Sequence, residues 1–544
     1  MINMASCVSA SPPKMESGNE PSLWGDFFIT YEQQPLQRYE EWMRVRADKL
    51  KAEVCKLYLT CNNVIEKITL VDVVQHLGIN HLFEEQTNNA LREISESEFS
   101  SSNIHEVSLR FRLLRAHGYW VSPDVFEKFK DNKGCFNKDI LNEPRGLLSL
   151  YNAAHLLTHG EPTLEEAITF ARNNLESMRS IKSPLAQQVQ RALQLPLPRT
   201  CKRVETLHYI SEYKQEQGHN PILLELAKLD FNLLQHVHLE ELKVISKWWK
   251  DLSGYIELSY VRDRVVEVYL WSCLVYYEER FGITRNMLTK IYKLITIIDD
   301  TYDKQASIEE CRKLHQAVQR WDESAVSLLP EYLKKFYNQM LRIFKEMEGE
   351  TSINGNNEID YLKKKLQTQF TYYLQEAEWV HKNYNPSFEE QVNMSTVTVG
   401  VPVACVGFMI GMGDVLPKKA LGWAYGVPDF IMACGKIARF ANDIAAFKRG
   451  KSKGDIASSV ECYMNENCVT RDVAVSRIDS LMEYEWRTMN RALFTDRAML
   501  PAVHRIIDFA ATMLLFYGGG IEGFSNSAHV QKTIESFYVN PILM

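Results

Sequence analysis

Apolar residues recur every three or four positions along most of this chain, and charged residues fill the positions between them. The segments TLEEAITFARNNLESM (163–178) and EELKVISKWWKDL (240–252) have this pattern most clearly. Such a period places apolar side chains on one face of an α-helix, where they pack against a core. Alternating strand patterns joined by Asn-Gly hairpin turns are essentially absent. We therefore predict an all-α fold.

A proline-bearing stretch, LQLPLPRTCKRVE (193–205), interrupts the helical pattern. Two prolines in quick succession disfavour a continuous helix, and 544 residues are too many for a single hydrophobic core. We predict a flexible N-terminus at 1–20, an N-terminal helical domain at 21–215 and a larger C-terminal helical domain at 216–544.

The longest uncharged run is STVTVGVPVACVGFMIGMG (395–413), whose length alone would suit a membrane span. Four glycines and Pro402 interrupt it, and nothing else in the chain supports a membrane topology. We predict a buried, broken helix here and no membrane span.

Composition narrows the class of protein further. Hydrophobic residues make up 45% and charged residues 24%, as in a folded soluble protein, and the net charge of −7 argues against a nucleic-acid-binding surface. The eleven cysteines form no CxxC pair, which predicts free thiols in a reducing compartment and no zinc site. The first twenty residues lack the apolar segment of a secretory signal and the arginines of a transit peptide. We expect a cytoplasmic protein, with a monomer as the default.

The sharpest feature is an aspartate cluster at the end of an apolar helix, TRNMLTKIYKLITIIDDTYD (284–303). Four apolar residues follow one another at helical spacing: Leu288, Ile291, Ile295 and Ile298. Asp299 continues that stripe, and Asp303 lies four residues later on the same predicted face, with Asp300 beside them. The simpler interpretation is a solvated acidic helix end, although the apolar run before it disfavours this.

Carboxylates at this spacing repel one another unless a cation lies between them. Mg²⁺ prefers such oxygen ligands and commonly shares them with substrate phosphates. An EF-hand is excluded, because the glycine and the distal glutamate of that loop are missing. Acids beside an apolar surface suggest a ligand with a greasy tail and a diphosphate head.

The segment IIDDTYD resembles the aspartate-rich motif of plant class I terpene synthases, and YVRDRVVEVYLW (260–271) resembles their RxR segment. Further similar segments are SLWGDFF (22–28), LLSLYNAAHLLTHGE (147–161), EAEW (376–379) and SSVECYM (458–464). The likeness extends over nearly the whole chain after residue 20. It implies two α-helical domains, an active site in the C-terminal one, and Mg²⁺ as cofactor, with Mn²⁺ as a possible substitute.

The resemblance also implies roles for individual residues. Arg262 and Arg264 would capture a diphosphate, and aromatic faces such as Trp271 and Tyr517 would stabilise a carbocation. FYGGGIEGFSNS (516–527) aligns with a lid in which relatives carry Asp and Tyr; here Glu522 and Phe524 stand at those positions. The absence of DxDD, and of paired arginines before Trp24, favours a sesquiterpene synthase that uses farnesyl diphosphate.

The second metal motif departs from the family pattern. In ARFANDIAAFKRGKSKG (438–454), Arg439, Asn442 and Asp443 are in place, and we assign Asn442 and Asp443 as metal ligands and Arg439 to diphosphate binding. Ala446 stands at the hydroxyl position and Gly450 at the glutamate position, and neither side chain can bind a metal. Three explanations stay open. In the first, the second metal site is weakened or rebuilt, and Lys448 and neighbouring basic residues supply charge. In the second the enzyme has much reduced or altered chemistry, and in the third the fold is retained for binding or regulation without turnover.

The kink at Val399–Pro402 corresponds to a broken helix that lines the family's cavity. Pro402 lacks an N–H, which leaves a carbonyl unpaired by the helix; that carbonyl either faces a cation or has no chemical role. The predicted function is that of a sesquiterpene synthase: Mg²⁺-dependent ionisation of farnesyl diphosphate and cyclisation of the carbocation to a sesquiterpene, with release of diphosphate. A chain-elongating prenyltransferase is disfavoured because NDIAAF is not a second DDxxD, and a catalytically impaired prenyl-diphosphate-binding protein is the alternative outside enzymes.

Overall fold

The computed structural model describes residues 21–31, 37–178, 181–351, 358–417, 419–449, 457–494 and 497–544. Within these ranges the chain is helical and contains no strand, and one isolated bridge joins Lys130 to Phe136. The predicted all-α class is therefore confirmed.

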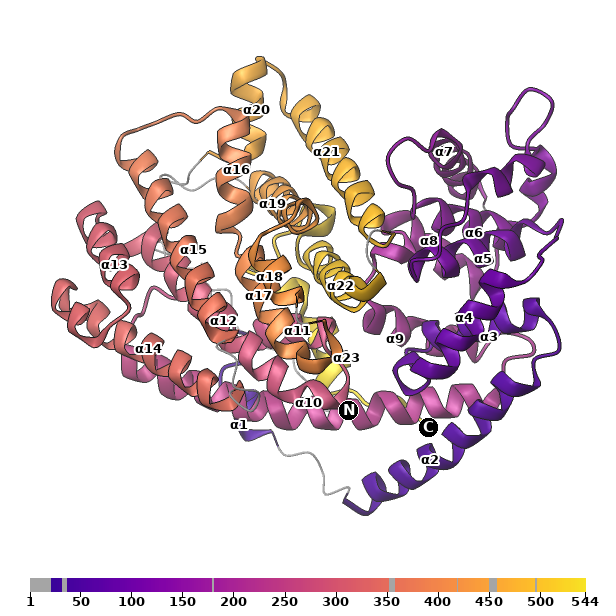
Figure 1. Cartoon of the computed structure of the whole chain (residues 1–544), viewed down its shortest axis with the longest axis horizontal. Coiled ribbons are helices and arrows are strands. Elements are labelled where there is room, and N and C mark those ends of the chain that lie inside the picture. Colours follow the sequence, from indigo (N-terminus) through magenta and orange to yellow (C-terminus); the bar gives the residue numbers. More distant parts are fainter. Residues whose placement is uncertain are drawn as a thin grey trace, which may run out of the picture.

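The first part of the chain forms nine helices within the described ranges. They are α1 (Phe27–Thr30), α2 (Gln37–Thr60), α3 (Val64–His76), α4 (Glu84–Glu96), α5 (Ile104–Ala116), α6 (Pro144–Ala154), α7 (Pro162–Ser177), α8 (Leu185–Gln194) and α9 (Lys202–Tyr213). In Figure 1, α3 to α9 form a lobe of their own, apart from the larger set of helices.

The second part begins with one long helix and continues as a bundle. Its helices are α10 (Pro221–Ile256), α11 (Val265–Val275), α12 (Gly282–Asp300), α13 (Ile308–Arg320), α14 (Glu331–Thr351), α15 (Glu358–His381), α16 (Phe388–Thr398), α17 (Val401–Met412), α18 (Ala420–Tyr425), α19 (Asp429–Arg449), α20 (Ser459–Asn467), α21 (Arg471–Ala492), α22 (Leu500–Tyr517) and α23 (Gln531–Tyr538). Several of these helices start with a capping box, in which a serine and the glutamate three residues later satisfy the exposed N–H groups; Ser307 with Glu310 does so for α13.

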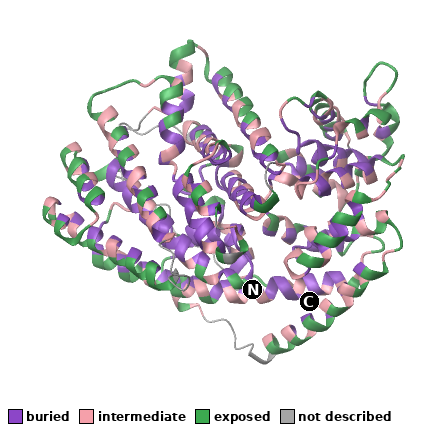
Figure 2. Cartoon of the chain, viewed as in Figure 1, coloured by how far each residue is buried: buried purple, intermediate pink, exposed green. Residues whose placement is uncertain are grey.

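Two large hydrophobic cores correspond to these two parts. α10 contributes to both, with Leu226 and Leu229 in the smaller core and Leu242 and Ile256 in the larger one. The two domains therefore share a helix, and the predicted boundary after residue 215 lies just before it. Figure 2 shows the buried residues on the inward faces of the helices, while outer helices such as α14 carry exposed residues.

The N-terminal segment belongs to the larger core, although it comes first in the sequence. Trp24 and Phe28 are buried there, and the Phe28 ring lies 6.0 Å from the Tyr538 ring of α23. α1 packs on α10. The start of the described chain therefore packs against the C-terminal bundle, next to that bundle's last helix.

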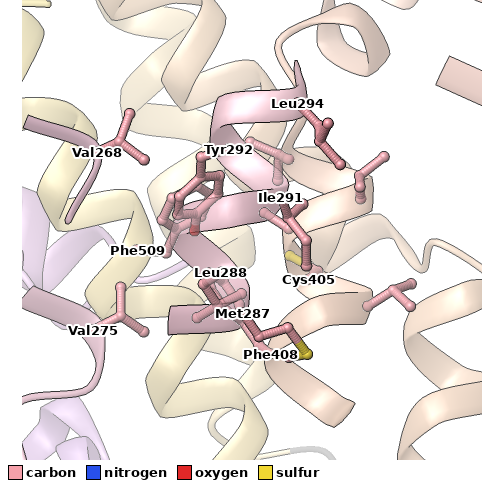
Figure 3. Packing of buried hydrophobic residues seen from close by; sticks show 14 of the residues in the cluster. Val268, Val275, Met287, Leu288, Ile291, Tyr292, Leu294, Cys405, Phe408 and Phe509 are labelled. Atoms are coloured by element: carbon pink, nitrogen blue, oxygen red, sulfur yellow. The ribbon is translucent and has the colours of Figure 1, made fainter. Parts of the chain in front are cut away.

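α12 lies at the centre of the larger core, between α11 and α17. Leu288, Ile291 and Ile298 are buried as predicted, and Ile295 is partly buried. Figure 3 shows how side chains of α12 meet those of α11, α17 and α22 around Leu288. Gly407 allows a close approach, because a Cβ there would lie 3.0 Å from the Leu288 side chain.

Among the described residues, two stretches are long and apolar enough to cross a membrane by composition alone: Phe388–Met412 and Arg497–Gly520. In the first, 83% of the most apolar window is buried inside the protein, and in the second 61%. The first is broken between α16 and α17, where Gly400 adopts φ +85°. Both stretches are accounted for by core packing, as predicted for residues 395–413.

Candidate active site

The predicted aspartates stand at the C-terminal end of α12. The α-helix ends at Asp300 and continues as one π-helical turn, Thr301–Gln305, which contains Asp303. The side chain of Asp300 is fully buried, that of Asp299 is 32% exposed, and Asp303 is exposed. The α-helical period that predicted Asp299 and Asp303 as a stacked pair therefore does not hold beyond Asp300.

Arg262, from the loop before α11, binds the adjacent residues Asp299 and Asp300. Its Nη2 lies 2.5 Å from Asp299 Oδ2, and its Nε lies 2.9 Å from Asp300 Oδ1. The Arg262 backbone N–H donates to Asp300 Oδ2 at 2.8 Å, and Lys304 Nζ lies 2.7 Å from Asp300 Oδ1. The structure thus brings Arg262 to the aspartate motif, where it competes with any metal ion for the same oxygens.

A buried carboxylate that we did not assign from the sequence completes this rim. Glu376 of α15 accepts a 2.9 Å hydrogen bond from the Thr398 hydroxyl. Burial, together with the nearby charges of Asp299 and Asp443, raises the pKa of Glu376 to about 7. Glu376 lies in the EAEW segment that we noted only for its resemblance.

The donor chemistry of this rim fits Mg²⁺, since mutually repelling carboxylates are stabilised by a shared divalent cation. Among the described residues, no three Asp, Glu, His or Cys side chains already converge closely enough to hold a metal ion. Because Arg262 occupies Asp299 and Asp300, metal binding requires the guanidinium to leave them. A diphosphate is a suitable new partner for that group.

Arg264 has a different position from the one its assignment implied. It is completely buried, and its nitrogens donate to the backbone carbonyls of Asp263 at 2.8 Å, Phe524 at 2.8 Å and Ser525 at 2.7 Å. Glu522 accepts hydrogen bonds from the N–H groups of Phe524 and Ser525. Arg264 therefore anchors the segment after α22, and Glu522 shapes its turn.

Aromatic rings form the wall beside this rim. Trp271 stacks on Phe524 with ring centroids 4.9 Å apart, and its edge contacts are Phe516 at 5.0 Å and Tyr292 at 5.8 Å. The Arg262 guanidinium lies 5.2 Å from the Phe524 ring. Phe524, which the sequence marked only as a lost tyrosine, is the residue that joins the aromatic wall to the charged rim. Figure 3 shows Tyr292 beside Phe509, with centroids 6.1 Å apart.

Tyr517 lies where the predicted groups meet. Burial and the Glu522 carboxylate raise the pKa of its hydroxyl, and the charges of Arg262 and Arg439 oppose that shift. Tyr517 is the last residue of α22, directly before the glycine turn Gly518–Gly520. The structure thus gathers residues from α12, α19, α22 and the loop before α11.

On α19, Arg439 Nη1 donates to Asn442 Oδ1 at 3.2 Å and lies 3.3 Å from Asp443 Oδ1. Asp443 is buried, and its Oδ2 accepts from the Ser459 N–H at 2.8 Å. Both oxygens of Asp443 therefore have protein partners, Arg439 and the backbone N–H at the start of α20. Ala446 offers no ligand atom, and Gly450 lies outside the described residues.

The break between α16 and α17 bears on the freed carbonyl at Pro402. The carbonyl that Pro402 cannot pair belongs to Thr398, and it accepts from Gln369 Nε2 at 2.8 Å and from the Tyr373 hydroxyl at 3.0 Å. Two donors on α15 therefore satisfy it. This pairing favours a structural role over a cation-stabilising one for the Thr398 carbonyl.

A cavity of about 970 Å³ lies elsewhere, between the two domains. Residues of both parts of the chain line it, including His117, Lys202 and His504. It contains none of the residues assigned from the sequence, and some of its charged groups pair with each other, as Lys202 does with Asp508 at 2.9 Å. We therefore keep the candidate site at the end of α12.

Comparison with known proteins agrees with this placement. Residues 23–193 match the terpene synthase N-terminal domain, and residues 250–488 match the terpene synthase family metal-binding domain. The chain is 50% identical to a tau-cadinol synthase of Zea mays over 96% of this chain and 97% of that protein. It is 46% identical to an alpha-copaene synthase of Zea mays over 96% and 99%.

Solved structures agree with the fold. Isoprene synthase from grey poplar leaves (Populus x canescens) superposes with a TM-score of 0.87 at 30% identity, covering 97% of this chain and 99% of that one. The same enzyme in complex with three Mg²⁺ ions and dimethylallyl-S-thiolodiphosphate superposes with a TM-score of 0.84 at 29% identity, covering 92% and 97%.

Proposed function

The chain belongs to the terpene synthase family, and we propose that it is a sesquiterpene synthase. The proposed reaction ionises farnesyl diphosphate, cyclises the carbocation and releases diphosphate. The observation that supports this most directly is the pairing of Arg262 with Asp299 and Asp300 beside the stack of Trp271 on Phe524. A charged rim and an aromatic wall meet there, as a diphosphate with an apolar tail requires.

Different residues of the chain bind the diphosphate and the metal ion in the proposed reaction. Arg262 and Arg439 present planar guanidinium groups that bind phosphate oxygens in pairs. Asp299, Asp303 and Glu376 would hold Mg²⁺, for which Mn²⁺ is the expected substitute. When bound, Mg²⁺ supplies the positive charge that neutralises the departing diphosphate.

Once the diphosphate leaves, the chain must protect a carbocation. The faces of Trp271 and Phe524 stabilise positive charge without acting as nucleophiles. Arg264 holds the backbone carbonyls of Phe524 and Ser525, and so keeps the segment after α22 packed over the site and excludes water. Tyr517 and Glu522 lie near each other, since burial and the Glu522 charge together raise the pKa of the Tyr517 hydroxyl, and they would influence the final proton transfer.

A C15 substrate is proposed because two relatives reported above are named tau-cadinol synthase and alpha-copaene synthase, which are sesquiterpene synthases. The test incubates the full chain with C10, C15 and C20 prenyl diphosphates and Mg²⁺, followed by gas chromatography–mass spectrometry. We expect cyclic C15 products from farnesyl diphosphate. Absence of hydrocarbon from all three substrates would reject the proposal.

The second candidate is a prenyl-diphosphate-binding protein with impaired turnover, which Ala446 and Gly450 favour. It predicts tight binding of farnesyl diphosphate with no diphosphate release, a result that calorimetry and a phosphate assay distinguish from turnover.

We also propose a cytoplasmic monomer. The cytoplasmic location is supported by ten cysteines without a disulfide in the described residues. Light scattering and the location of a fluorescent fusion test these two points.

A further inference from the structure

The second half of the expected metal site does not fit a metal ion. In the described part of α19 the polar groups facing the site are already engaged: Asn442 Oδ1 accepts from Arg439, and the two oxygens of Asp443 bind Arg439 and the Ser459 N–H. A neutral amide that accepts from an arginine is a poor ligand for Mg²⁺, which requires anionic or freely available oxygens.

The two positions that would repair this half carry no donor. Ala446 has only a methyl group, and Gly450 has no side chain. A divalent ion on this side of the substrate would depend on the diphosphate and water for nearly all its ligands. By contrast, Asp299, Asp303 and Glu376 on the opposite side are carboxylates, which supply the oxygen ligands that Mg²⁺ prefers.

Positive charge on α19 is available from side chains instead. Arg439 is held near Asp443, Glu376 and Asp299, and its Nε is buried without a hydrogen-bond partner among the described residues. A buried, unpaired guanidinium N–H is costly and is satisfied when an anion binds beside it. Arg439 is therefore prepared for a phosphate oxygen.

Lys448 lies further along the same helix and crosses the glycine turn after Tyr517. A Cβ on Gly520 would collide with the Lys448 side chain, so the absence of a side chain there allows the lysine to lie against the turn. Gly520 also adopts φ +76°, which disfavours any other residue. Within the described ranges no carboxylate lies at ion-pair distance from Lys448 Nζ; the Asp479 carboxylate is near enough to feel the lysine's charge, without a direct contact.

We propose that this chain binds the diphosphate with the metal ions of the Asp299, Asp303 and Glu376 side alone. Arg439 and Lys448 supply, from α19, the positive charge that a further metal ion would give. This inference rests on the proposed function and concerns how the same site holds its substrate. It predicts fewer metal ions than the three in the isoprene synthase complex.

The first experiment counts bound metal without relying on turnover. The full chain is dialysed to equilibrium against Mn²⁺ and inorganic pyrophosphate, and Mn is measured per chain after subtracting the protein-free compartment. We expect fewer than three Mn²⁺ per chain, and one more in the variant carrying Ala446→Ser and Gly450→Glu. Three Mn²⁺ in the natural chain, or no gain in a folded double variant, would overturn the inference.

The outcomes separate this inference from the function it rests on. If the natural chain makes C15 products and carries three Mn²⁺, only the inference is wrong. If it binds no Mn²⁺ with pyrophosphate and makes no product, the proposed function is wrong as well.

The second experiment tests Lys448. Lys448→Met should weaken pyrophosphate binding about tenfold at saturating Mn²⁺, the loss of about one charge-assisted contact, while the Mn count stays constant. Lys448→Arg should restore most of the affinity. The matched control is Lys334→Met, an exposed lysine on α14 that pairs with Glu331. Equal pyrophosphate affinity in Lys448→Met and the control would show that Lys448 does not contribute to diphosphate binding.

Discussion

The competition between Arg262 and a metal ion makes a specific prediction about Arg262→Met. Arg262 pairs with Asp299 at 2.5 Å and with Asp300 at 2.9 Å, and the Asp300 side chain is fully buried. Removing one partner of a buried ion pair costs about 3–5 kcal/mol. Lys304 still pairs with Asp300 at 2.7 Å, so we expect the lower end of that range.

The same change should strengthen metal binding. In the natural chain Mg²⁺ competes with Arg262 for Asp299 and Asp300, whereas in the variant that competition is removed and only Lys304 still pairs with Asp300. If even half of the lost pairing energy returns on metal binding, the Kd for Mg²⁺ without diphosphate falls at least about tenfold, or about 1.4 kcal/mol. Product formation should fall at the same time, because the variant lacks a phosphate-binding group.

Isothermal titration of the metal-free proteins with Mg²⁺ measures this directly. Arg342→Met is the matched control, since Arg342 pairs with Glu346 at 2.9 Å on the exposed face of α14. Its Mg²⁺ affinity should equal that of the natural chain. An Arg262→Met protein that binds Mg²⁺ no more tightly than this control would show that Arg262 does not compete with Mg²⁺ for Asp299 and Asp300.

Three further perturbations test other parts of the structure. Because burial raises the pKa of Glu376 from 4.5 to about 7, ionising it opposes folding: the metal-free protein should lose up to about 3 kcal/mol between pH 4.5 and 7, and urea midpoints for Glu376→Gln should lack that loss. Phe524→Leu removes an aromatic stack worth about 1 kcal/mol from the wall, so chromatography should find more water-captured alcohols; an unchanged product mixture would contradict this role. Gly411→Ala should destabilise the fold by about 1–3 kcal/mol, because its methyl group would collide with Thr284, whereas Gly422→Ala, with open space around it, should not; equal melting temperatures would count against the close packing of α17 on α12.

The sequence predicted the parts of this site that depend on local periodicity. The stripe from Leu288 to Ile298 and its continuation to Asp299 follow from the helical repeat alone, and α12 has both. The π-helical turn at Thr301–Gln305 did not follow, because it depends on how the chain leaves the core after Asp300. The break before Pro402 was predicted, since proline and glycine act locally on the backbone.

The sequence pattern could not predict which groups from distant segments pair with each other in the fold. Glu376 takes its role from the packing of α15 against the broken helix at Thr398, 22 residues later, and its segment carried only a resemblance. Asp443 looked like a ligand because it is an acid beside Asn442, yet tertiary contacts direct it to Arg439 and Ser459. Arg264 looked like the equal of Arg262, but its burial against the carbonyls of Phe524 and Ser525 gives it a different role.

The central claim is that the acids ending α12 hold the divalent metal that drives ionisation of a C15 diphosphate. The most direct test compares the natural chain with Asp299→Asn, an almost isosteric change, in steady-state assays with farnesyl diphosphate over a range of Mg²⁺ concentrations. We predict a loss of kcat of at least about a hundredfold, or about 2.7 kcal/mol, and a higher Mg²⁺ requirement. A variant that forms product at the natural rate and at the natural Mg²⁺ concentration would contradict the account.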